Sequence, residues 1–151
     1  MFNVRVYGIL INKEKQVLVS DELIKGNYYT KFPGGGLEIG EGTRDCLKRE
    51  FKEEMNLNVQ VGDHIYTTDF YQKSAWNNQQ IISIYYYVKA LEEITVPLRT
   101  KEFDFDTEQL RIYEMQKEIE TFRMIDWDSF SADIVTLPID KLVANLLKGY
   151  C

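Results

Sequence analysis

Three glutamates lie close together in one segment that the sequence predicts to be helical. Residues 43–55 contain no Gly or Pro and are rich in Glu, Lys, Arg and Leu, which is typical of an α-helix. At about 100° per residue, its apolar residues cover one face and a set of carboxylates covers the neighbouring face. The carboxylates of this set are Glu50, Glu53 and Glu54.

Such a set of carboxylates points to metal chemistry. Like charges at spacings of three and four residues repel one another by roughly 0.2–0.5 kcal/mol per pair on an exposed helix. A divalent cation would convert this repulsion into coordination, and Mg2+ prefers oxygen ligands and commonly sits between protein carboxylates and substrate phosphates. The alternative is a solvated helix face with no ligand, which is the common situation for a Glu-rich helix.

The residues around the helix favour the functional alternative, because they resemble the Nudix box. That motif has a Gly, five residues, Glu, seven residues, Arg-Glu, an apolar residue, any residue, Glu-Glu, any residue, Gly and an apolar residue. The positions that match, within residues 35–57, are Gly35, Glu41, Arg49, Glu50, Phe51, Glu53, Glu54 and Leu57. Asn56 replaces the last Gly, and we expect it to preserve the left-handed helix end, because Asn tolerates that conformation.

The resemblance to the Nudix family implies a role for each matching residue. Metal ligands would be Glu50, Glu53 and Glu54, with the Gly34 carbonyl and Glu118 as further candidates. Glu53 or Glu50 would be catalytic, and the sequence leaves open which carboxylate orients or deprotonates the attacking water. Gly35 would supply a turn, and an ion pair between Glu41 and Arg49 would tie the loop to the helix.

The same resemblance implies hydrolysis of a pyrophosphate bond with Mg2+ or Mn2+. The substrate would be a nucleoside diphosphate linked to another group, such as ADP-ribose, a nucleotide sugar or a nucleoside triphosphate. The alternative function is a catalytically silent Nudix module that binds a nucleotide as a sensor or regulator. Tyr29, Phe32 and Trp76 could contact the substrate, although aromatic residues on strands usually pack in the core.

Composition excludes other classes of function. The 151-residue chain has a formal charge of −6, so we expect neither nucleic acid nor an anionic membrane surface as a partner. The only histidine, His64, excludes mechanisms that need a histidine pair or triad. Two cysteines, Cys46 and Cys151, form no disulfide framework, and the first residues do not look like a signal peptide. We therefore expect a cytoplasmic protein, and the sequence leaves a homodimer open.

The remaining pattern predicts an α/β protein of the α+β type, with a Nudix-like mixed β-sheet packed between helices in a single domain, residues 1–151. Apolar residues predict a hairpin of residues 2–11 and 16–20. Further strands are expected at 28–32, 59–71, 81–91 and 122–127. A last helix is expected at 141–148, whereas residues 107–120 fit either a helix or a long loop.

Overall fold

Strand pairing divides the protein into two units, which we describe separately. The computed structural model describes residues 1–150. Unit 1 comprises Met1–Leu10 and Pro33–Thr95, and unit 2 comprises Ile11–Phe32 and Val96–Cys151. Each unit contains one four-stranded sheet, in which some neighbouring strands are parallel and others are antiparallel. The expected α+β architecture is therefore confirmed, with two mixed sheets and three helices over the described residues.

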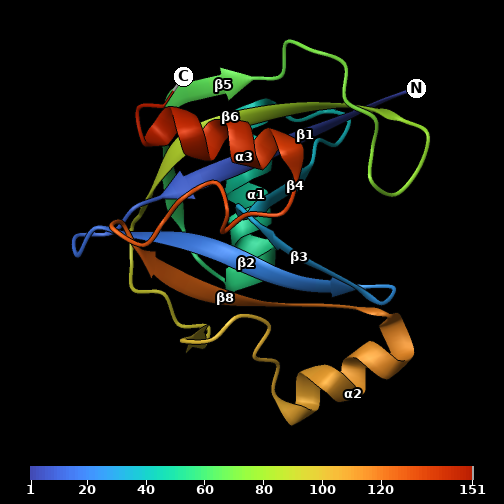
Figure 1. Cartoon of the computed structure of the whole chain (residues 1–151), viewed down its shortest axis with the longest axis vertical. Coiled ribbons are helices and arrows are strands. Elements are labelled where there is room, and N and C mark those ends of the chain that lie inside the picture. Colours follow the sequence, from blue (N-terminus) through green and yellow to red (C-terminus); the bar gives the residue numbers. More distant parts are fainter. Residues whose placement is uncertain (151) are drawn as a thin grey trace. The chain divides into compact units, whose positions relative to one another are not determined.

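Unit 1 is built around the strand β1, which occupies an inner position of its sheet. The strand order is β4-β1-β6-β5, with β1 antiparallel to β4 and parallel to β6. Figure 1 shows β1 and β6 running side by side. The bounds of the elements are β1 Phe2–Leu10, β4 Gly34–Gly36, α1 Thr43–Met55, β5 Val59–Thr67 and β6 Gln80–Ala90.

Helix α1 packs on one face of this sheet through the apolar side chains that the sequence predicted. Its buried residues are Cys46, Leu47, Phe51 and Met55. The helix spans the expected residues 43–55. Gly42 is its N-cap, and the Thr43 hydroxyl bonds to the Tyr86 hydroxyl at 2.7 Å. The expected left-handed end is confirmed: Asn56 has φ 51° and ψ 39°.

Unit 2 contains the second sheet, with strand order β3-β2-β8-β7. A bidentate ion pair is buried in it, with Arg123 donating to both Asp21 oxygens at 2.6 and 3.0 Å. Thr30 Oγ1 donates to the same carboxylate at 2.7 Å, so its desolvation is compensated by hydrogen bonds. The elements are β2 Gln16–Ile24, β3 Asn27–Lys31, β7 Leu98–Arg99, α2 Thr107–Gln116, β8 Glu118–Asp126 and α3 Pro138–Leu147.

The predicted hairpin of residues 2–11 and 16–20 is wrong. The turn itself exists, because the Asn12 N–H donates to the Gln16 carbonyl and a single antiparallel bridge joins Ile11 to Val17. Beyond that bridge, β1 pairs with β4 and β6, and β2 pairs with β3 and β8. Both edges of each strand are thus occupied by strands from elsewhere in the chain.

Two helices of unit 2 show how local signals set their ends. The ambiguous segment 107–120 divides into a helix and the start of β8, and the helix begins at an Asp106–Gln109 capping box. Helix α3 begins at Pro138, three residues before the expected start, because proline suits the first helical position. Asp140, expected just outside the helix, is buried in its first turn and accepts a bond from the Phe32 N–H at 3.4 Å.

Gly8 offers a test of the packing of α1 on β1. A Cβ atom at this position would lie 2.6 Å from Val88 Cγ2 and 2.8 Å from Phe51 Cε1. We expect Gly8→Ala to lower the free energy of unfolding by about 1–3 kcal/mol, measured by urea denaturation, because the core must shift to admit a methyl group.

Gly36→Ala is the matched control, because its nearest neighbour would lie at an ordinary 3.7 Å. This variant should change the free energy of unfolding by less than about 1 kcal/mol. Equal losses in both variants would contradict the packing argument.

Candidate metal and pyrophosphate site

The all-glycine strand β4 brings its backbone against the carboxylate side of α1. A Cβ atom on Gly35 would lie 2.5–2.6 Å from the three carboxyl atoms of Glu50. Gly34 has φ 151°, and a Cβ there would lie 2.1 Å from the Val6 carbonyl oxygen. Only glycine fits at position 34, and the absence of a side chain on Gly35 allows the Glu50 carboxylate to lie directly on the strand.

Arg49 is the centre of the hydrogen-bond network at this site. Its Nε and Nη2 donate to the two carboxylate oxygens of Glu41 at 2.9 and 2.7 Å. Nη2 also donates to the Gly36 carbonyl at 3.0 Å. This bidentate pair ties the loop before α1 to the helix, as the planar guanidinium fork allows.

The third nitrogen of Arg49 joins two of the predicted metal ligands. Nη1 donates to Glu50 Oε1 at 2.9 Å and to Glu53 Oε2 at 3.2 Å. The two carboxylates differ in exposure, since the Glu50 side chain is 14% exposed and the Glu53 side chain 59%. One positive centre thus holds both carboxylates together, and Glu53 is the more exposed of the two.

The third predicted ligand, Glu54, is half-buried one residue further along α1. Within residues 1–150, no group of three or more His, Cys, Asp or Glu side chains surrounds a single point as the ligands of a bound metal do. The donor chemistry nevertheless fits a hard cation, because these side chains offer carboxylate oxygens and two of them already converge on the Arg49 nitrogen. We therefore keep the metal-ligand roles as a proposal.

Sequence analysis missed two groups of this network. The Glu38 N–H donates to Glu41 Oε1 at 2.9 Å, and the Glu38 carboxylate lies 3.4 Å from Arg49 Nε. The Gly36 carbonyl accepts from both Arg49 and the Cys46 thiol. Only the spacing of Glu38, three residues before Glu41, could have indicated the first of these contacts.

The charges of the network have large effects on ionisation. Hydrogen bonds from Arg49, and then from the Glu38 backbone, lower the pKa of Glu41 from 4.5 to about 2. The bond to Glu41 raises the pKa of Arg49 above its ordinary value. Burial, assisted by Glu41, raises the pKa of the Cys46 thiol to about 12. Cys46 is therefore a buried neutral thiol at pH 7, whereas Cys151 lies outside the described residues.

The other candidates lie away from α1 in the chain, and we describe each within its own unit. In unit 1, Trp76 lies between β5 and β6 and is 38% exposed. In unit 2, Tyr29 is half-buried on β3, and Glu118 is the exposed first residue of β8. Phe32 is fully buried and packs against Phe130 at a ring distance of 6.0 Å, which favours a core role for its ring.

The Glu41–Arg49 pair predicts an acid-sensitive contribution to stability. Because the pKa of Glu41 is lower in the folded than in the unfolded chain, the pair stabilises the fold above about pH 4.5 and loses this effect as the pH falls toward 2. The free energy of unfolding of Glu41→Gln should therefore lie below that of the wild type at neutral pH. The difference should narrow on acidification, and urea denaturation across this pH range measures it; a gap that stays constant would contradict the pair's role.

Comparisons with known proteins agree with the motif. The family model for the NUDIX domain matches residues 1–133. The comparison with curated proteins gives no match. No helix among the described residues is both long and apolar enough to cross a membrane.

Solved structures show the same fold at low sequence identity. A NUDIX hydrolase from Nitrosomonas europaea has a TM-score of 0.69 and 14% identity, over 99% of this chain and 90% of that one. A MutT protein from Methanosarcina mazei Go1 has a TM-score of 0.68 and 13% identity, over 98% and 94%. An ADP-ribose pyrophosphatase from Streptococcus suis 89-1591 has a TM-score of 0.55 and 13% identity, over 98% and 92%. With the family model spanning most of the sequence and the box lying on β4 and α1, the chain belongs to the Nudix family.

Proposed function

We propose that this chain, a Nudix-type pyrophosphohydrolase, uses Mg2+ or Mn2+ to hydrolyse a nucleoside diphosphate linked to another group. The observation that carries the proposal is the set of three carboxylates within one turn of α1, two of them held by Arg49. Nudix hydrolases generally use divalent metals, so a carboxylate set inside the box is where a metal is expected. Substrates of the ADP-ribose, nucleotide-sugar or nucleoside-triphosphate type all carry the required pyrophosphate.

Some residues of the box would bind the metal, and others would position these ligands. Glu50, Glu53 and Glu54 would hold the metal, with the Gly34 carbonyl and Glu118 as further candidate ligands. A bound divalent cation would neutralise the pyrophosphate and promote formation of hydroxide from water. Glu53 or Glu50 would orient or deprotonate the attacking water, and both remain candidates for that role.

Gly35, Glu41 and Arg49 would support the site without touching the substrate. Gly35 lets Glu50 lie on the strand, and Arg49 donates to both Glu50 and Glu53. Because Arg49 is also bound to Glu41 and to the Gly36 carbonyl, its guanidinium would stay in place if Glu53 turned toward a metal. Tyr29 is kept as a candidate substrate contact, whereas the buried ring of Phe32 packs in the core.

We propose that residues 1–151 act as one Nudix domain, since the family model spans parts of both units. The low cysteine content supports a cytoplasmic location. A small-molecule nucleotide is the expected partner, and a homodimer remains open.

A substrate panel tests the proposed reaction. The protein is incubated with Mg2+ and nucleoside triphosphates, nucleotide sugars, dinucleoside polyphosphates and ADP-ribose, and both products are identified. We expect Mg2+-dependent release of a nucleoside monophosphate or of pyrophosphate from one class. Tight nucleotide binding with no hydrolysis across the panel would instead support the silent sensor module.

Substitution of single carboxylates tests the metal assignment. Glu53→Gln and Glu54→Gln should each lower turnover by about 10^3-fold, which corresponds to roughly 4 kcal/mol of transition-state stabilisation. Each change removes one charge and little volume, so the variants should fold normally by circular dichroism. Glu114→Gln, on the exposed surface of α2, is the matched control and should retain wild-type turnover. Near wild-type turnover in both site variants would overturn the assignment.

A further inference from the structure

Between β5 and β6 the chain forms a small ordered hairpin of residues 72–81, which lies outside the Nudix box. An antiparallel bridge joins Lys73 to Gln80. The Ile81 N–H donates to the Gln72 carbonyl at 2.8 Å, and the Ser74 N–H donates to the Gln79 carbonyl at 2.9 Å. The hairpin therefore lies directly before β6 and leads into the start of that strand.

Side-chain bonds hold the tip of the hairpin in one conformation. The Gln79 N–H donates to Asn77 Oδ1 at 2.8 Å, and Asn77 Nδ2 donates to Gln79 Oε1 at 3.3 Å. The Trp76 N–H donates to Ser74 Oγ at 3.1 Å. These local bonds are typical of Asx and Ser turns, and they keep the partly exposed Trp76 indole at the tip.

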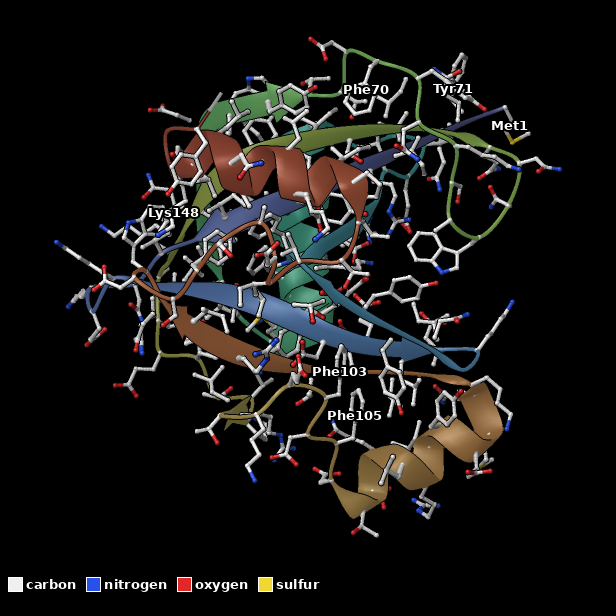
Figure 2. All side chains as sticks on the ribbon, in the orientation of Figure 1. Met1, Phe70, Tyr71, Phe103, Phe105 and Lys148 are labelled. Carbon is white, nitrogen blue, oxygen red and sulfur yellow. The ribbon has the colours of Figure 1, made fainter. Side chains whose placement is uncertain are left out.

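The hairpin lies at the same end of the sheet of unit 1 as the loop of the Nudix box. The Gln80 N–H donates to the Met1 carbonyl at 3.1 Å, and the Leu37 N–H donates to the Val4 carbonyl at 2.9 Å. Both segments therefore adjoin the first four residues of the chain, which span only about 10 Å. Figure 2 shows the exposed side chains of Met1, Phe70 and Tyr71 at this end.

The chemistry of the tip suits a flat, polar heterocycle. Residues 75–78 are Ala-Trp-Asn-Asn and carry no charge, so they would not bind a phosphate by themselves. An indole provides a stacking surface, and exposed amides such as Asn78 provide donors and acceptors for the edge of a base. A nucleobase uses both kinds of contact.

We propose that the 72–81 hairpin binds the nucleobase of the substrate by stacking it on Trp76. The proposal rests on the proposed function, because it assigns the base of the same substrate to a second element of unit 1. Purines should bind more tightly than pyrimidines, since a larger ring system overlaps more of the indole. The enzyme would then act on purine nucleoside diphosphate derivatives in preference to pyrimidine ones.

Tryptophan fluorescence tests base binding without any turnover. The chain has two tryptophans, and the second, Trp127, stacks on Phe130 in unit 2. A Trp127→Phe variant of the full chain therefore leaves Trp76 as the only indole. Titration with AMP should quench its fluorescence, CMP should need a higher concentration, and ribose 5-phosphate, which has no base, should have little effect. No quenching by AMP, or equal quenching by ribose 5-phosphate, would overturn the proposal.

Steady-state kinetics provide a second measurement in the otherwise wild-type chain. Trp76→Ala should raise KM for a purine substrate about tenfold with little change in kcat, and Trp76→Phe should recover most of the loss. The KM for phosphoribosyl pyrophosphate, a diphosphate ester without a base, should not change. Tyr71→Ala removes a more exposed aromatic ring from the same loop and is the matched control.

The outcomes separate this proposal from the proposed function. Equal rises in KM for the substrates with and without a base, or the same rise in Tyr71→Ala, would overturn the role of Trp76 while leaving hydrolysis established. Failure of the wild type to hydrolyse any substrate would overturn the proposed function, and the AMP titration would still decide whether the hairpin binds a base.

Discussion

The ion pair between Arg49 and Glu41 is the interaction on which the candidate site depends. The loop between β4 and α1 has no regular structure, and most of its side chains are exposed. Arg49 joins this loop to the helix through Glu41 and the Gly36 carbonyl, and the same guanidinium holds Glu50 and Glu53. A lysine, with one nitrogen, could not reach these four groups at once.

The residues of the site also lower the stability of unit 1, and the rest of that unit must offset the loss. Three glutamates on one helix repel one another, and three successive glycines in β4 contribute no side chains to the core. The neighbouring face of α1 compensates by burying its apolar residues, with Phe51 packed closely over Gly8 of β1. The packed side chains and the carboxylates thus lie on neighbouring faces of one helix.

Prediction from sequence succeeded where the signals were local. The helix over residues 43–55 and its left-handed end at Asn56 both follow from residues within a few positions of one another. Prediction failed for the pairing of β1 and β2, because a turn at residues 12–15 does not decide which strands pair with β1 and which pair with β2. The contact of Arg49 with both Glu50 and Glu53 was also missed, because helix periodicity places side chains on a face without giving their rotamers.

The sequence by itself determined the family and the candidate residues of the site, because the Nudix box is a contiguous segment that covers one strand, one loop and one helix. The tertiary structure decided which strand lies beside β4, where the hairpin of Trp76 lies relative to the box loop, and how closely Glu50 approaches Gly35. The physical reason is that backbone donors and acceptors are the same in every strand. Pairing over long sequence separations is therefore selected by the packing of the whole sheet and not by any local pattern.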